Sequence, residues 1–176
     1  MKRTVALGAF AVVSAMLVLA VFLGTRHGAH EANGIHSPLL GHPAPALSGT
    51  SLMNESQHLS LRQWRGQDVI VNFWASWCGP CQREAPELSA FAWQHRGDAQ
   101  VIGVVFNDSL AGARDFARHY GSLYPSVVDE GGVIANRYGV VSPPTTFVID
   151  RAGRVAAVLV GATTQRQLNV VLARVR

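Results

Sequence analysis

Residues 69–81 read VIVNFWASWCGPC, a β-branched and aromatic run that ends in two cysteines separated by a glycine and a proline. The apolar part of this run has the composition of a strand that is buried on both faces of a sheet. Pro80 follows Gly79 where the apolar run stops, and proline is well tolerated in the first turn of a helix. The stretch therefore predicts a central strand that leads into a helix, with Cys78 and Cys81 at the junction.

The rest of the chain supplies a sheet and helices around this strand. Further strands are predicted at 101–106, 126–128, 145–149 and 155–160, and further helices at 113–120, at 133–138 and after Thr163 or Thr164. Turn-forming residues at 150–153 indicate that the last two strands form a hairpin. Asp108 or Ser109 is the expected cap of the 113–120 helix. This order of elements predicts a mixed sheet flanked by helices.

The first 24 residues differ from the rest. Lys2 and Arg3 precede an apolar run over 5–23 that contains no acid or base. About 20 apolar helical residues cross a bilayer core of roughly 30 Å. We therefore expect residues 1–24 to be an uncleaved signal-anchor that forms one transmembrane helix; a long signal peptide that is removed after export is the alternative. In both cases the basic N-terminus stays inside, which places the rest of the chain outside the cytoplasm.

Residues 25–40 are rich in Gly, His and Asn and have no hydrophobic period, so we expect a flexible linker there. Residues 41–176 then suit one domain with one core. Histidines in and beside the linker match no helix face and join no cysteine or carboxylate cluster, which favours a solvated tether over a metal site. These histidines are His27, His30, His36 and His42.

The charge balance excludes some partners and some chemistry. Of the 15 basic residues, Lys2 and Arg3 precede the apolar run, which leaves 13 arginines against 11 acids and a net charge of only +2. Such a balance does not suggest a nucleic-acid partner. No lysine follows Lys2, so the exported part has no amine side chain to act as a nucleophile.

Only two cysteines occur, and a disulfide between them would close a very short loop. Such a bond constrains little of the unfolded chain, so a redox site is a better explanation than a structural disulfide. A zinc site needs four ligands, an iron–sulfur cluster needs more cysteines, and covalent haem needs a histidine where Gln82 stands. We therefore expect no metal and no other cofactor.

The two cysteines are expected to divide the chemistry. Unpaired amides and the positive end of the helix dipole would stabilise a thiolate on Cys78. Cys81 lies one turn further into the helix and should be more buried. We therefore expect Cys78 to be an exposed attacking group that forms a mixed disulfide with a substrate, and Cys81 to resolve it.

Several motifs resemble the extracytoplasmic thioredoxin-like proteins of the TlpA, ResA and CcmG/DsbE group. They are NFWASWCGPC at 72–81 with Glu84 and Pro86 after it, YGV at 138–140 and PTTFVID at 144–150, and the resemblance runs from Gly41 to the C-terminus. It implies a thioredoxin-like α/β fold: a central mixed sheet with helices on both faces, extended by an N-terminal β-hairpin. It also implies reduction of disulfides in exported proteins, several of which are apocytochromes c, and recharging by a membrane thiol donor of the CcdA or DsbD type.

The resemblance also implies a substrate-binding surface beside the cysteine pair. It is expected to comprise Trp77, Gly79, Pro80, Pro143 and Pro144. Pro144 matches the cis-proline of the family, whose neighbouring backbone pairs with a substrate strand. Pro143 departs from the family pattern and removes an amide donor. Trp74 is expected mainly to pack in the core.

Glu84 follows Cys81 by three residues and shares its helix face. A carboxyl group buried there would have a raised pKa and could accept the Cys81 proton, whereas a partly exposed helix carboxylate would have no catalytic role. Asn72 occupies the position of an aspartate in cytoplasmic thioredoxins and cannot titrate, and the resemblance favours Glu84 for this task.

Three functions remain open from the sequence. The leading hypothesis is a disulfide reductase of exported proteins, anchored by a single pass in the cytoplasmic membrane with its catalytic domain on the extracytoplasmic side. A disulfide oxidase would use the same residues in reverse, because the direction depends on the relative stability of dithiol and disulfide. A thioredoxin-like binding module without redox activity is the third.

Overall fold

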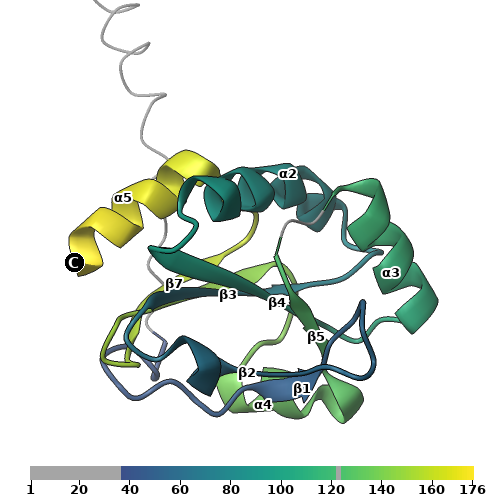
Figure 1. The fold of residues 1–176 in the computed structure, drawn as a ribbon, viewed down its shortest axis with the longest axis horizontal. Coiled ribbons are helices and arrows are strands. Elements are labelled where there is room, and N and C mark those ends of the chain that lie inside the picture. The colour runs from purple at the N-terminus through teal and green to yellow at the C-terminus, as the bar shows by residue number, and fades with distance from the viewer. Residues whose placement is uncertain (1–36, 122–123) are drawn as a thin grey trace, which may run out of the picture. The chain divides into compact units, whose positions relative to one another are not determined.

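Five strands form one mixed sheet in the order β5-β4-β3-β6-β7 in the computed structural model (Figure 1). β3 lies at the centre, parallel to β4 and antiparallel to β6, and all seven of its residues are buried. The strands are β3 (Asp68–Trp74), β4 (Ala99–Val105), β5 (Ser126–Val128), β6 (Thr145–Ile149) and β7 (Val155–Val160). The apolar run at 69–74 therefore forms the central strand, as its composition predicted.

The structure describes residues 37–121 and 124–176. The predicted signal-anchor at 1–24 and most of the predicted linker at 25–40 lie outside the described residues. Among the helices that are described, none combines the length and the apolar character that a bilayer crossing requires.

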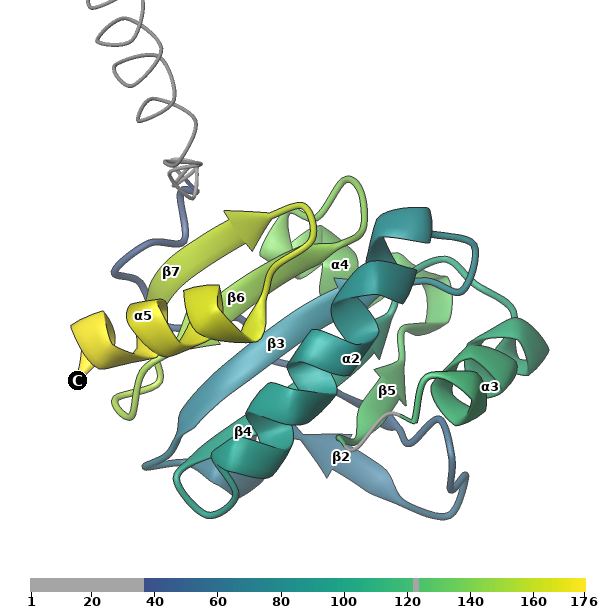
Figure 2. The same ribbon diagram turned by 90° about the horizontal axis from the view of Figure 1, so that it is seen from above.

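Helices cover both faces of the sheet. Figures 1 and 2 show α2 and α5 over one face, with α3 beside them, and α4 beneath the other face together with the β1–β2 hairpin. The elements are β1 (Ser48–Thr50), β2 (His58–Ser60), α2 (Gly79–Gln94), α3 (Leu110–His119), α4 (Val133–Tyr138) and α5 (Gln165–Val175), with short 3-10 turns at Leu61–Trp64 and Glu130–Gly132. This is the thioredoxin-like α/β fold with an N-terminal hairpin that the sequence predicted.

The alternation of side chains along β3 divides the core into layers. Phe73 points towards α4, where its ring centroid lies 5.3 Å from that of Tyr138. Ile70 belongs to the opposite layer with Leu88 of α2 and Leu168 of α5. Because successive side chains on a strand alternate, Asn72 lies on the Ile70 side and projects a polar group towards α2.

The predicted ranges of 133–138, 145–149 and 155–160 agree with the observed elements. Ser109, one of the two expected caps of α3, accepts a hydrogen bond from the Gly112 amide at 3.1 Å, and the helix begins at the next residue. The prediction of a cap at Asp108 or Ser109 is therefore confirmed for Ser109.

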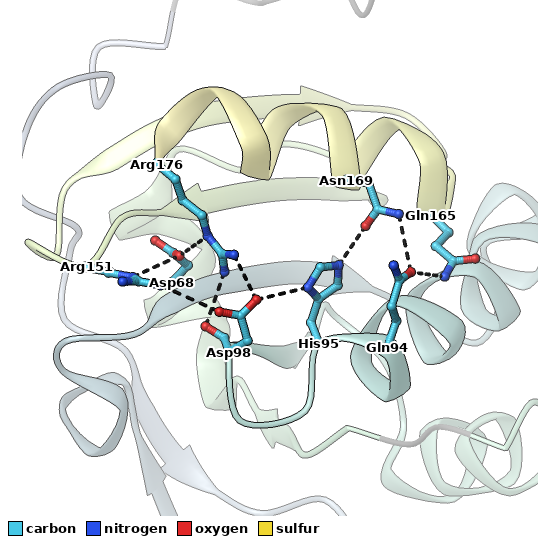
Figure 3. Close-up of polar contacts among 8 residues, drawn as sticks. All are labelled: Asp68, Gln94, His95, Asp98, Arg151, Gln165, Asn169 and Arg176. Carbon is cyan, nitrogen blue, oxygen red and sulfur yellow. Dashed lines mark hydrogen bonds and ion pairs between the residues drawn. The ribbon is translucent and has the colours of Figure 1, made fainter.

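A cluster of charged side chains closes the sheet at the start of β3 (Figure 3). Asp68 accepts hydrogen bonds from Nε of Arg176 at 2.8 Å and from Nε of Arg151 at 3.4 Å. Arg176 also pairs with Asp98 at 2.8 Å, which holds the pKa of the Asp98 carboxyl below its ordinary value. We call Asp68, Asp98, Arg151 and Arg176 the Asp68 network. It joins the end of α5 to the sheet and to the α2–β4 turn.

Candidate active site

A disulfide bond joins Cys78 and Cys81 where β3 leads into α2, with an S–S distance of 2.07 Å. Cys78 is the N-cap residue of α2, and its Sγ accepts a hydrogen bond from the Cys81 amide at 3.2 Å. Gly79 and Pro80 form the first two positions of the helix and are exposed. The sulfur of Cys78 therefore occupies the site at a helix N-terminus where negative charge is stabilised.

The prediction that Cys78 is an exposed attacking group is wrong for this oxidised form. Cys78 is 4% exposed and Cys81 is 2% exposed, so the two residues hardly differ in burial. Cys78 belongs to a buried apolar cluster with Trp74, Ala75 and Cys81, and these neighbours cover its side chain. Trp77, by contrast, is 58% exposed beside the pair.

The loop after β4 braces the segment that leads to Cys78. Trp77 Nε1 donates a hydrogen bond to the Asn107 carbonyl at 3.1 Å. Ser76 donates from its amide and its hydroxyl to the two carboxylate oxygens of Asp108, at 2.5 and 3.0 Å. Sequence reasoning treated Asp108 only as a possible helix cap. The available signal was a polar run directly after a parallel strand, because the carboxyl ends of β3 and β4 meet at one edge of the sheet.

Pro144 lies at the same edge of the sheet. Its peptide bond with Pro143 is cis, which confirms the prediction. The β3–β6 register pairs Phe73 with Thr145, so Pro144 lies level with the end of β3 from which the cysteine segment departs. Pro143 is half-buried, and its part in substrate choice stays a prediction.

Glu84 is 1% exposed on α2, one turn beyond Cys81. Its Oε1 accepts hydrogen bonds from Asn72 Nδ2 at 2.6 Å and from the Thr146 hydroxyl at 3.4 Å. Burial raises the pKa of Glu84 from 4.5 to about 8, while the Thr163 backbone and the side chains of Thr146 and Asn72 oppose this rise. The Thr163 backbone also faces this carboxyl group, and Glu84 Oε2 has no hydrogen-bond partner. The predicted buried carboxyl group is therefore present.

Trp74 is a packing residue, as predicted. It is 2% exposed and stacks on Phe116 with 4.7 Å between ring centroids.

Across residues 37–121 and 124–176, no group of three or more histidines, cysteines and acids is placed so that it could hold a metal ion.

Sequence comparison assigns residues 40–158 to the AhpC/TSA family. The thiol-disulfide oxidoreductase ResA of Bacillus thuringiensis subsp. konkukian (strain 97-27) is 30% identical over 138 residues, which are 77% of this chain and 78% of that protein. The thioredoxin-like protein YneN of Bacillus subtilis (strain 168) is 33% identical over 132 residues, which are 73% of this chain and 76% of that protein.

Structure comparison agrees with these relatives. A secreted thiol-disulfide isomerase from Corynebacterium glutamicum superimposes with a TM-score of 0.68 at 32% sequence identity, covering 73% of this chain and 81% of that one. The fold, the cysteine pair at the helix N-terminus and these relatives agree on one activity. The chain therefore belongs to the AhpC/TSA family and is a thiol–disulfide oxidoreductase with a thioredoxin-like fold.

Proposed function

We propose that this oxidoreductase works as a reductase of disulfides in exported proteins, with apocytochrome c as its substrate class. The observation that carries the direction is the buried Glu84 carboxyl on the helix face of Cys81. A carboxylate there disfavours a thiolate on Cys81, and a dithiol that is not stabilised gives up its electrons more readily. The motifs shared with the ResA group support the substrate class.

The reaction begins with the reduced pair. The Cys78 thiolate attacks one sulfur of the substrate disulfide, and a mixed disulfide forms while the other substrate sulfur leaves and takes a proton. Cys81 then transfers its proton to the Glu84 carboxylate and attacks Cys78 Sγ. The second substrate sulfur leaves, and the Cys78–Cys81 disulfide seen in the structure is the product.

Recharging requires two electrons and two protons, which a dithiol donor supplies. We propose a membrane thiol carrier of the CcdA or DsbD type for this step. We also propose that residues 1–24 anchor the protein by a single pass in the cytoplasmic membrane and that 25–40 link this anchor to the domain. The basic start and apolar run of the sequence support this topology, and the likeness to a secreted isomerase supports a location outside the cytoplasm.

The reduction potential of the Cys78–Cys81 pair tests the direction. A value near the thioredoxin potential of about −270 mV supports the reductase, whereas one near the DsbA potential of about −120 mV overturns it in favour of an oxidase. The helix N-terminus stabilises the Cys78 thiolate and so shifts the reduction potential towards the oxidase value. The measured potential therefore shows whether this effect or the opposing effect of Glu84 on Cys81 is larger.

Disulfide reduction of insulin tests whether the cysteines act at all. Wild-type protein with a dithiol donor should reduce insulin, and Cys78→Ala should abolish that activity. An inactive wild-type protein would favour a binding module.

Reduction of a peptide that carries the oxidised Cys-x-x-Cys-His sequence of an apocytochrome c tests the substrate class. A preference for an unrelated peptide disulfide of equal length would contradict that substrate class.

A further inference from the structure

Two polar residues on neighbouring strands hold the Glu84 carboxyl from below. Asn72 of β3 and Thr146 of β6 are direct partners in the antiparallel register. Both are buried, at 1% and 0% exposed, on the sheet face that α2 covers. Side chains of directly opposed residues lie on the same side of a sheet, so this pair forms one polar patch in a layer that is otherwise apolar.

The hydrogen bonds within this patch have a defined direction. The Asn72 side-chain nitrogen can only donate, and it lies 2.6 Å from Glu84 Oε1 and 3.0 Å from Thr146 Oγ1. The Thr146 hydroxyl accepts from Asn72 and donates its own hydrogen to Glu84 Oε1. Both donors therefore meet the same carboxyl oxygen, and Oε1 must be the acceptor whether or not Glu84 carries a proton.

The second carboxyl oxygen is left for the proton. Oε2 is buried and has no hydrogen-bond partner. A proton on Oε1 would face the donor hydrogens of Asn72 and Thr146, whereas Oε2 takes part in no hydrogen bond. Three groups face this carboxyl group from β3, β6 and the β7–α5 loop: Asn72, Thr146 and the Thr163 backbone. None of them titrates near neutral pH. The cysteine pair on α2 is the titrating partner on its own helix.

We propose that Asn72 and Thr146 are positioning residues that hold Glu84 by Oε1 and leave Oε2 as the oxygen that binds and releases the proton. The proposal rests on the proton-transfer role given to Glu84 above. It assigns a task to Asn72, which cannot titrate, and to Thr146, which the sequence motif does not distinguish from the threonine before it.

Titration of the Glu84 carboxyl in the oxidised protein tests the positioning. Glutamate labelled with carbon-13 at Cδ gives a resonance that Glu84→Gln removes, which assigns it. Thr146→Val keeps the shape and removes a donor that favours the charged form, so the titration midpoint should move to higher pH. Thr146→Ser keeps the hydroxyl and should restore the wild-type midpoint. A wild-type or lower midpoint in Thr146→Val would overturn the proposal.

Two further variants guard this result. Thr145→Val makes the same change one residue earlier, where the hydroxyl donates to the Ser142 carbonyl at 2.8 Å, and it should leave the Glu84 midpoint unchanged. Asn72→Leu removes the shorter hydrogen bond and should raise the midpoint further. If Asn72→Leu does not fold, the valine and serine variants at position 146 still decide the question.

Infrared spectroscopy of the same labelled protein locates the proton. With the proton on Oε2, the C=O group is C–Oε1, which accepts from both positioning residues. Thr146→Val should then shift the C=O stretch of protonated Glu84 to higher wavenumber. An unmoved band would show that Oε1 is not the double-bonded oxygen and would overturn the assignment of the proton to Oε2.

Kinetics separate this proposal from the proton-transfer role. The pH profile for release of a mixed disulfide on Cys78 should move with the carboxyl midpoint, and at pH 7 Thr146→Val should be about three- to ten-fold slower, the equivalent of one lost hydrogen bond. If Glu84→Gln leaves that profile unchanged, the proton-transfer role fails. The positioning is then still judged by the midpoint and the infrared band.

Discussion

Two buried carboxyl groups lie near opposite ends of β3, and their surroundings differ in one respect. Asp68 at the start of β3 and Glu84 near its other end are each 1% exposed. Asp68 lies against the guanidinium groups of Arg151 and Arg176 (Figure 3), whereas Glu84 lies against the neutral donors of Asn72 and Thr146. The Asp68 carboxyl group is ion-paired with two arginines, whereas the Glu84 carboxyl group has a raised pKa and retains its proton more readily.

This contrast shows that the two ends of β3 differ in role: the Asp68 end stabilises the fold, and the other end leads to the redox site. A buried carboxylate beside cations is a fixed part of the fold, and removing its partners is costly. A buried carboxyl group with only neutral donors has a raised pKa, so it can exchange a proton near neutral pH. Experiments that change either set of neighbours can break this comparison or sharpen it.

Glu84→Gln should have the largest effect, on the pH dependence of stability. The folded-state pKa of about 8 lies above the ordinary value of 4.5, so the stability that the bound proton contributes is complete below pH 4.5 and is lost as the pH rises to about 8. At 1.36 kcal/mol per pH unit this amounts to about 5 kcal/mol. Glutamine cannot titrate and should remove that loss.

Urea unfolding of the oxidised proteins between pH 4.5 and 8.5 measures this difference. The two stability curves should diverge steadily across the range, because every other titrating group is common to both proteins. Parallel curves would mean that Glu84 titrates normally, and the contrast with Asp68 would then disappear.

Replacing Arg151 and Arg176 together with alanine should have the next largest effect. It leaves the Asp68 carboxyl buried without a cation, and we expect a loss of about 2–3 kcal/mol in the free energy of unfolding, below the value for a fully buried pair because both arginines are partly exposed. Insulin reduction should be unchanged in the folded protein. A loss of turnover without a loss of stability would show that this end also serves the chemistry.

His95→Ala should cost less, about 1 kcal/mol of unfolding free energy, because it removes one hydrogen-bond contact between α2 and α5. His95 Nε2 lies 2.8 Å from Asn169 Oδ1 and its Nδ1 lies 3.3 Å from Asp98 (Figure 3). Thermal unfolding of this variant and of the double arginine variant under the same conditions shows which of the two loses more stability. A larger loss in His95→Ala would place the main attachment of α5 at the histidine.

Arg118→Ala should have the smallest effect, below about 0.5 kcal/mol in the free energy of unfolding. Arg118 pairs with Asp115 on α3, but the two side chains are 60% and 73% exposed. Urea unfolding at pH 7 checks this value. A loss comparable to that of the Asp68 network would show that ion pairing alone, without burial, stabilises this fold.

Much of the fold followed from local patterns. The composition of 69–74 predicted the central strand, and the turn residues at 150–153 predicted the β6–β7 hairpin. The start of α3 was predicted through its cap, Ser109. The short strands β1 and β2 were expected only from the resemblance, as an N-terminal hairpin, since three residues are too few for a period to show.

The site divides in the same way. The spacing of Cys78 and Cys81 predicted a redox pair at a helix N-terminus. The place of Glu84 one turn further left a buried and a partly exposed acid open, and only the resemblance favoured the buried one. Thr146 as a donor to Glu84 could not be predicted, because it lies 62 residues away from its partner. Asp108 lies 32 residues away from Ser76, and the polar run after β4 was its only signal.

The sequence by itself determined the reacting atoms: two thiols three residues apart, a carboxyl one turn beyond them and a proline before a strand. Each feature is local in the sequence, and helix geometry places the thiols and the carboxyl group relative to one another without help from the rest of the chain. Only the tertiary structure decided their environment. Strand pairing set Asn72 opposite Thr146, and burial under α2 removed water from Glu84. Proton affinity depends on such neighbours, and neighbours are fixed by packing.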